Sequence, residues 1–179
     1  PSTLAYAITG TLTIDGVEIV WCADIDRGLV ERRAADLCVP NAGSPEEAAR
    51  DELGEAMLVV NLTPPAAHAD VSRQFLEAGK HVYTEKPLAT TLEDARDVLA
   101  TATRRSLQVG AAPDWLLSRS ARAARAAVEA GRIGEPVAAS AFIAHSRLET
   151  WHPDPRGFFL PGAGPVLDLG PYYVSALVE

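Results

Sequence analysis

The chain has little sulfur: among its 179 residues are only two cysteines, Cys22 and Cys38, and one methionine. Two cysteines without metal-ligand spacing form neither a disulfide framework nor a zinc motif, so we expect a protein of a reducing, cytoplasmic compartment. No apolar run reaches the roughly 20 residues of a transmembrane helix, and no signal peptide is visible. The sequence therefore predicts no membrane partner.

Positive charge is also scarce, because 16 Lys and Arg stand against 24 Asp and Glu and the net charge is −8. Binding to a phosphate backbone needs clustered cations, so we expect no nucleic-acid partner. The one cationic stretch, at Arg119, Arg122 and Arg125, follows a helical spacing and is typical of a solvated face. With 47% apolar and 22% charged residues, the composition is that of an ordinary globular protein with a core.

Short apolar runs alternate with helical patterns along the first two thirds of the chain. We predict strands at 17–23, 56–61, 80–84 and 107–110, and helices at 26–37, from Ser44, at 66–78, 91–103 and 115–130. This alternation predicts an α/β fold with a Rossmann-type, doubly wound parallel sheet at 1–112. Residues 113–179 then begin a second, α+β domain, with a strand at 136–144 in a different sheet and a loop at 147–164.

The glycine-rich fingerprint of dinucleotide-binding sheets, G-x-G-x-x-G, is absent. Residues 6–13 have the pattern of the first helix, which in such a fold follows the first strand and the glycine loop. We therefore expect that strand and loop to lie upstream of Pro1, and the chain to be an internal piece of a longer protein.

Polar or turn residues follow three of the predicted strands: Asp24, then Thr63-Pro64-Pro65, then Glu85-Lys86-Pro87. Open parallel sheets bind ligands at the carboxyl ends of their strands. An acid after the second strand suits both ribose hydroxyls and repels a 2′-phosphate, which favours NAD over NADP. Two simpler alternatives remain: Asp24 only caps the next helix, and Glu85-Lys86 is a solvated charged turn.

Five motifs in this order resemble the Gfo/Idh/MocA family of NAD(P)-dependent oxidoreductases. They are Gly16-Val-Glu-Ile-Val-Trp-Cys-Ala-Asp24, Asn61-Leu-Thr-Pro-Pro-Ala-Ala-His68, Glu77-Ala-Gly-Lys-His-Val-Tyr-Thr-Glu-Lys-Pro-Leu-Ala89, Gly131-Arg-Ile-Gly-Glu-Pro136 and Gly162-Ala-Gly-Pro-Val-Leu-Asp-Leu-Gly-Pro-Tyr-Tyr173. The resemblance covers essentially the whole chain. It implies a Rossmann domain, a following α+β domain that often makes oligomer contacts, and reversible oxidation of a sugar or polyol hydroxyl.

The resemblance also implies three catalytic positions. Lys86 matches a lysine that contacts substrate and cofactor, and Asp168 matches an acid that orients the substrate. Four residues later the family often has a histidine, where this chain has Tyr172. A tyrosine can handle a proton, but its ordinary pKa is about 10, so a nearby cation such as Lys86 has to assist it. The alternative is that Tyr172 only packs or hydrogen-bonds.

Further positions follow from the same motifs. On the cofactor side we expect Asp24, Thr63, Pro64, His68, Glu85 and Lys86, and on the substrate side Lys86, His152, Asp168 and Tyr172. His68 has a second interpretation, as a structural residue at a helix start, and His152 has one as a loop-packing residue. No metal ligands are predicted.

The resulting hypothesis is hydride transfer between NAD and a sugar, polyol or related hydroxyl, in a protein that forms a homo-oligomer. Two alternatives predict no hydride transfer by this chain. In the first, the protein is a catalytically inactive or regulatory homologue that keeps the fold. In the second, the chain is a fragment unable to bind the cofactor.

Overall fold

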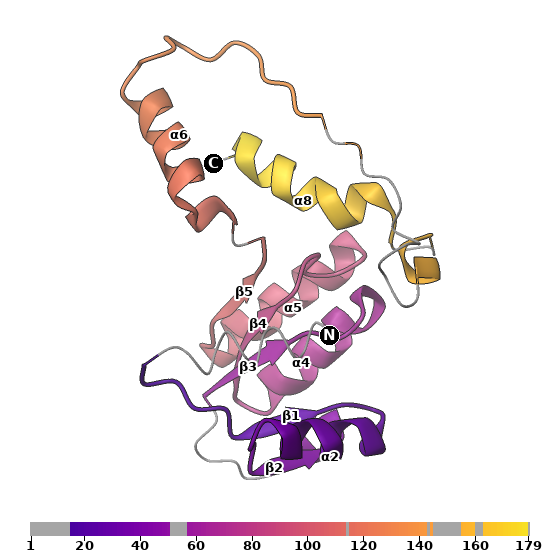
Figure 1. Ribbon diagram of the computed structural model, residues 1–179. Coiled ribbons are helices and arrows are strands. Elements are labelled where there is room, and N and C mark those ends of the chain that lie inside the picture. Colours follow the sequence, from indigo (N-terminus) through magenta and orange to yellow (C-terminus); the bar gives the residue numbers. More distant parts are fainter. Residues whose placement is uncertain are drawn as a thin grey trace.

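The computed structural model describes residues 15–50, 57–113, 115–142, 144, 155–159 and 163–178. Within these ranges every strand pairing is parallel, and the strands form two sheets (Figure 1). In the first sheet, β1 (Trp21–Ala23) pairs with β2 (Asn41–Gly43). In the second, β4 (His81–Thr84) lies between β3 (Leu58–Asn61) and β5 (Val109–Ala111).

This order is that of a Rossmann sheet, in which the strands run 3-2-1-4-5-6. Strands β2 and β1 take the third and second places, and β3, β4 and β5 take the fourth to sixth. The described residues contain no strand at the first place, between β1 and β3. The predicted parallel α/β sheet is confirmed. The sequence did not reveal β2, because three residues of the composition Asn-Ala-Gly carry no strand pattern.

Helices link the strands and cover both faces of the sheet. They are α2 (Arg27–Asp36), α3 (Pro45–Arg50), the 3₁₀ turn η1 (Pro65–Ala67), α4 (His68–Glu77) and α5 (Leu92–Arg105). Alternate residues of a strand point to opposite faces. Cys22 accordingly packs with Val30 of α2, whereas its neighbours Trp21 and Ala23 pack against the core of the second sheet. The sheet is therefore doubly wound, as predicted.

The larger core holds β4 between α4 and α5. Val82 of β4 is 2% exposed, and it packs with Phe75 and Leu76 of α4 and with Val98 of α5. Full burial of such a side chain contributes about 1.5–3 kcal/mol. The turn that follows β4 therefore starts from a strand held on both sides.

The helix ends follow the signals in the sequence. The side chains of Asp26 and Thr91 accept the N–H three residues further on, as N-caps do. Ser44 and Glu47 form a capping box, in which each side chain accepts the other's backbone N–H, at 3.1 and 2.8 Å. Gly79 ends the turn after α4 with a φ of +81°, a conformation that favours glycine.

The remaining described elements are η2 (Trp115–Leu117), α6 (Arg119–Glu129), η3 (Pro155–Phe159) and α8 (Pro165–Val178). Figure 1 shows α8, in yellow, beyond one end of the β3–β4–β5 unit, with α6, in orange, near it. In the part of the chain that the structure describes, none of the helices has the length and apolar composition to cross a bilayer.

The prediction of a strand at 136–144 is wrong for its described residues. Residues 136–142 have no regular secondary structure and pair with no strand among the described residues. Val137 and Phe142 are 95% and 89% exposed. An apolar, β-branched pattern predicts a strand only if a neighbouring strand is available to pair with it. The loop predicted at 147–164 also contains the short helix η3.

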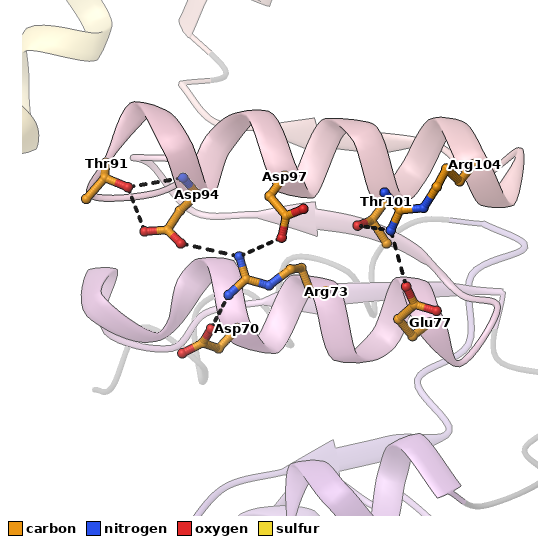
Figure 2. A network of polar contacts seen from close by, with 8 residues as sticks. All are labelled: Asp70, Arg73, Glu77, Thr91, Asp94, Asp97, Thr101 and Arg104. Carbon is orange, nitrogen blue, oxygen red and sulfur yellow. Dashed lines mark hydrogen bonds and ion pairs between the residues drawn. The ribbon is translucent and has the colours of Figure 1, made fainter.

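A polar network joins α4 to α5 (Figure 2). From α4, the guanidinium of Arg73 contacts Asp70, donates to Asp94 at 3.3 Å and lies 3.2 Å from Asp97. Asp94 also accepts the hydroxyl of Thr91 at 2.6 Å. The bond from Thr91, followed by the bond from Arg73, holds the pKa of the Asp94 carboxyl below its usual value.

This network predicts a pH dependence of stability. A carboxyl whose pKa is lowered by folding stabilises the protein above its unfolded-state pKa, and that contribution is lost as the pH falls through the folded-state pKa. We expect Asp94→Asn to lose less unfolding free energy than the wild type between about pH 5 and about pH 3. Urea unfolding across that range measures the difference. Asp36→Asn, whose carboxylate lies 3.9 Å from Arg33, is the control. Parallel pH profiles for wild type and Asp94→Asn would contradict the assignment.

Candidate functional site

Residues that follow three parallel strands meet at one edge of the second sheet. Leu62-Thr63-Pro64 follows β3, Glu85-Lys86-Pro87 follows β4, and Ala112-Pro113 follows β5. The backbone links them, because Glu85 N–H donates to Asn61 O at 2.9 Å and Ala112 N–H donates to Thr84 O at 3.0 Å. The Lys86–Pro87 and Ala112–Pro113 peptide bonds are both cis.

Lys86 connects this edge to α8. Its ammonium donates to the carbonyl oxygen of Asp168 at 2.8 Å and also bonds the carboxylate oxygen Oδ1 of the same residue. The two side chains are only 16% and 25% exposed. Asp168 lies in the first turn of α8, where the helix dipole favours a negative charge. The structure thus brings together two residues that the sequence separates by 82 positions.

Tyr172 completes this contact from the next turn of α8. The Lys86 ammonium lies 5.7 Å from the centre of its ring, within the range of a cation–π interaction. The backbone of Tyr172 is anchored as well, because the indole N–H of Trp115 in η2 donates to its carbonyl oxygen at 3.0 Å. The cation that we expected near Tyr172 is therefore present, over the face of the ring.

Asn61, the last residue of β3, organises the turn after it. Its side chain is 2% exposed and makes four hydrogen bonds. The amide nitrogen donates to His68 O and to the hydroxyl of Ser72, both at 3.0 Å. The amide oxygen accepts the N–H of Thr63 at 3.2 Å and its hydroxyl at 2.7 Å. One buried amide therefore ties the Thr63 turn to the start of α4.

His68 is buried beneath the two turns, with 1% of its surface exposed. Its Nδ1 lies 2.6 Å from the carbonyl oxygen of Pro87, and its Nε2 lies 2.7 Å from that of Thr63. Both ring nitrogens thus face the protein backbone. This geometry agrees with the structural alternative for His68, in which the ring acts on the site through the turns that it bonds.

Glu85 and Asp24 are both partly exposed. A carboxylate oxygen of Glu85 accepts the N–H of Lys86 at 3.0 Å, so it shapes the same turn. Asp24 follows β1 in the first sheet, and its Oδ1 accepts the N–H of Asp26 at 2.9 Å. Asp26, and not Asp24, caps α2. No contact among the described residues joins Asp24 to Lys86.

The expected positions therefore fall into two groups. Lys86, Asp168 and Tyr172 touch one another, and the cofactor-side residues Thr63, Pro64, His68 and Glu85 belong to the bonded turns beside them. His152 lies outside the described residues. No group of three or more metal-ligating side chains occurs in the described ranges.

Sequence reasoning gave no role to Asn61 or Trp115. A signal for Asn61 existed, since an amide ends an otherwise apolar strand and a buried amide needs partners. Trp115 had no such signal, because its partner lies 57 residues away.

Three comparisons show what the chain resembles. The profile of the oxidoreductase family with an NAD-binding Rossmann fold matches residues 6–112. The 1,5-anhydro-D-fructose reductase of Ensifer adhaerens is 37% identical over 106 residues, which cover 57% of this chain and 31% of the reductase. The inositol 2-dehydrogenase/D-chiro-inositol 3-dehydrogenase of Lacticaseibacillus casei is 30% identical over 135 residues, which cover 73% of this chain and 37% of the dehydrogenase.

One solved structure extends the likeness in fold along nearly the whole chain. An NAD-binding protein from Listeria innocua superposes with a TM-score of 0.77 at 24% identity, covering 99% of this chain and 51% of that one. The chain spans about a third of the length of the curated relatives that it matches.

The Asn61 network yields a prediction of stability. Asn61→Ala removes four hydrogen bonds and leaves buried backbone and hydroxyl groups unpaired, so we expect a loss of about 2–4 kcal/mol in unfolding free energy. The control is Asn41→Ala in β2, whose amide makes one bond, to Val20 O at 2.9 Å, and whose loss should cost about 1 kcal/mol. Urea unfolding compares the two variants, and equal losses would contradict the central place of Asn61.

Proposed function

The chain belongs to the oxidoreductase family that has an NAD-binding Rossmann fold, and we propose that the protein transfers a hydride between NAD and a hydroxyl-bearing carbon of a sugar, polyol or related substrate. In this proposal Lys86 bonds the reacting oxygen and assists its proton transfer, and Asp168 orients the substrate. Tyr172 lies beside both and gives a further hydrogen-bonding group on the substrate side.

The observation that carries the proposal is the arrangement of the Lys86 ammonium. A lysine has three N–H donors. Two of them go to the carbonyl and carboxylate oxygens of Asp168, and the third has no acceptor among the described residues. The third donor is thus available to a substrate oxygen, in a place of low exposure where a hydrogen bond from a cation is strengthened.

The residues at the strand ends fit a dinucleotide. Oδ1 of Asp24 is used within the loop, while Oδ2 has no partner in the described part of the chain and is available to ribose hydroxyls. Its negative charge favours NAD over NADP. The Thr63-Pro64 and Glu85-Lys86 turns follow neighbouring parallel strands and lie at the same end of the sheet. They would hold the nicotinamide half of the cofactor. Bound NAD would supply the hydride acceptor, while the protein orients the reactants and handles the proton.

The names of two relatives support this substrate class: one is a 1,5-anhydro-D-fructose reductase and the other is an inositol dehydrogenase. Both names describe chemistry at a carbon bearing a hydroxyl or carbonyl in a polyhydroxylated ring. A bonded lysine–carboxylate pair suits such a substrate, because it offers a donor and an acceptor to neighbouring hydroxyls.

We also propose that residues 113–179 begin a second domain that contributes to a homo-oligomer. Support comes from α8, where Val166, Val174 and Leu177 are 80%, 60% and 57% exposed, and from the exposed Phe142. Several exposed apolar side chains on one part of a protein are typical of a surface that is buried in a protein–protein interface. His152, in the same part of the chain, remains proposed on the substrate side.

A protein that binds the cofactor without turnover is the second candidate, and Tyr172 favours it because tyrosine replaces a more readily titrating histidine. A screen of sugars and polyols for NADH formation, paired with NAD titration by calorimetry, separates the two. Binding with turnover supports the oxidoreductase. Binding without turnover of any substrate supports the second candidate.

Lys86→Met provides the direct test of the catalytic assignment. We expect kcat/KM for the best substrate to fall by about 10²–10⁴-fold, because a positioned acid–base group is lost, which is a larger effect than the change in the Kd for NAD. Lys80→Met is the matched control, since Lys80 precedes β4 and so lies at the opposite edge of the sheet. The assignment fails if Lys86→Met retains wild-type kcat/KM.

Asp24→Asn tests the cofactor assignment. Removing the charge weakens the bonds to the ribose hydroxyls and removes the repulsion of a 2′-phosphate, so we expect NAD to bind about tenfold more weakly and NADP more tightly. Calorimetric titration with each nucleotide gives the two Kd values. Asp36→Asn, at the far end of α2, controls for the change in net charge. An unchanged ratio of the two Kd values would count against a ribose role for Asp24.

A further inference from the structure

The two turns that carry the proposed cofactor and catalytic residues are joined by a single buried ring. The Pro87 carbonyl, next to Lys86, lies 2.6 Å from Nδ1 of His68. The Thr63 carbonyl, on the turn after β3, lies 2.7 Å from Nε2. Among the described residues, no side chain other than that of His68 bonds both turns.

Both partners are carbonyl oxygens, which only accept hydrogen bonds. A neutral imidazole has one N–H, so one of the two contacts would place a bare nitrogen lone pair against an oxygen. Only the imidazolium, with a proton on each nitrogen, satisfies both contacts. The two distances are short, as is usual for bonds from a cationic donor.

His81 gives an internal comparison. Its Nδ1 accepts the backbone N–H of Gln108 at 2.9 Å, so that nitrogen carries no proton. The hydrogen-bond patterns therefore assign different protonation states to two histidines of the same chain.

Some groups around His68 favour the protonated ring and others disfavour it. Burial and the start of α4 disfavour a cation, whereas two bonds from a charged donor favour it. Several charged side chains on α4, α5 and the neighbouring turn bond partners other than His68: Asp70, Asp94 and Asp97 bond Arg73, Lys86 bonds Asp168, and Glu85 accepts the N–H of Lys86. The two carbonyls are thus the groups that hold the charge.

We propose that His68 is a positioning residue which, as an imidazolium, holds the Thr63 turn and the Lys86-Pro87 turn together. It thereby fixes the position of the proposed nicotinamide-binding turn relative to Lys86. The consequence for catalysis rests on the proposed function, whereas the clamp itself, meaning the two bonds from the His68 ring to these turns, does not. Loss of the Pro87 bond loosens the turn that carries Lys86, and loss of the Thr63 bond loosens the cofactor side.

The first test reads the protons directly. In the protein labelled with ¹⁵N at histidine, at pH 7, we expect His68 to show a proton on both ring nitrogens and His81 to show an unprotonated Nδ1. The spectrum of His68→Gln assigns the His68 signals. A bare ring nitrogen on His68 overturns the proposal, whether or not the protein turns over any substrate.

The second test separates the two bonds. An asparagine amide nitrogen stands near the place of Nδ1, and a glutamine amide nitrogen near that of Nε2. His68→Gln therefore keeps the Thr63 bond, and we expect kcat to fall about tenfold with little change in KM for NAD. His68→Asn keeps the Pro87 bond, and we expect KM for NAD to rise about tenfold with a smaller change in kcat.

Thr101→Val is the control for a purely structural loss, because Thr101 is a buried polar residue of α5 that is 1% exposed and bonds Arg104. We expect it to lower the melting temperature without altering kcat or KM. Equal effects of His68→Gln and His68→Asn on kcat and KM, or no effect of either, would overturn the positioning role. If the wild type neither binds NAD nor turns over substrate, the proposed function fails, and the ¹⁵N spectrum alone decides on the clamp.

Discussion

Lys86 extends from the turn after β4 to α8, and its ammonium bonds the backbone carbonyl oxygen and the carboxylate Oδ1 of Asp168. This polar side-chain contact joins the carboxyl ends of the strands to α8. An ion pair of this low exposure is screened little by salt, but its desolvation offsets much of the attraction. Its value therefore lies in geometry: it places an ammonium, a carboxylate and the Tyr172 ring together, and one N–H of the lysine has no acceptor among the described residues.

The position of Lys86 depends in turn on groups beneath it. β4 is packed between α4 and α5, so the turn begins from a rigid strand. Asn61 and His68 then fasten the neighbouring turns through backbone groups, and both are almost fully buried. Buried polar side chains with every partner present rigidify a structure, whereas a missing partner is costly. The partly buried Lys86 ammonium is thus supported by the fully bonded, buried side chains of Asn61 and His68.

Local chemistry made much of this predictable. The N-caps Asp26, Ser44 and Thr91, the glycine stop at Gly79 and the polar strand ends all follow from rules that act within a few residues. Strand β2 was not predictable, because its pairing with β1 and not its composition makes it a strand. The segment at 136–142 shows the converse, a strand pattern that has no partner strand among the described residues. The contacts of Lys86 with Asp168 and of Trp115 with Tyr172 are set by tertiary packing, which local spacing does not encode.

A double-mutant cycle between Lys86 and Asp168 tests the central claim most directly. The cycle uses Lys86→Met, Asp168→Asn and the double variant in the full-length protein, with kcat/KM as the measured quantity. If the two side chains act as one bonded unit, the double variant is little worse than the poorer single variant, with a coupling energy of about 1–3 kcal/mol. Strictly additive effects, with coupling close to zero, would contradict the account.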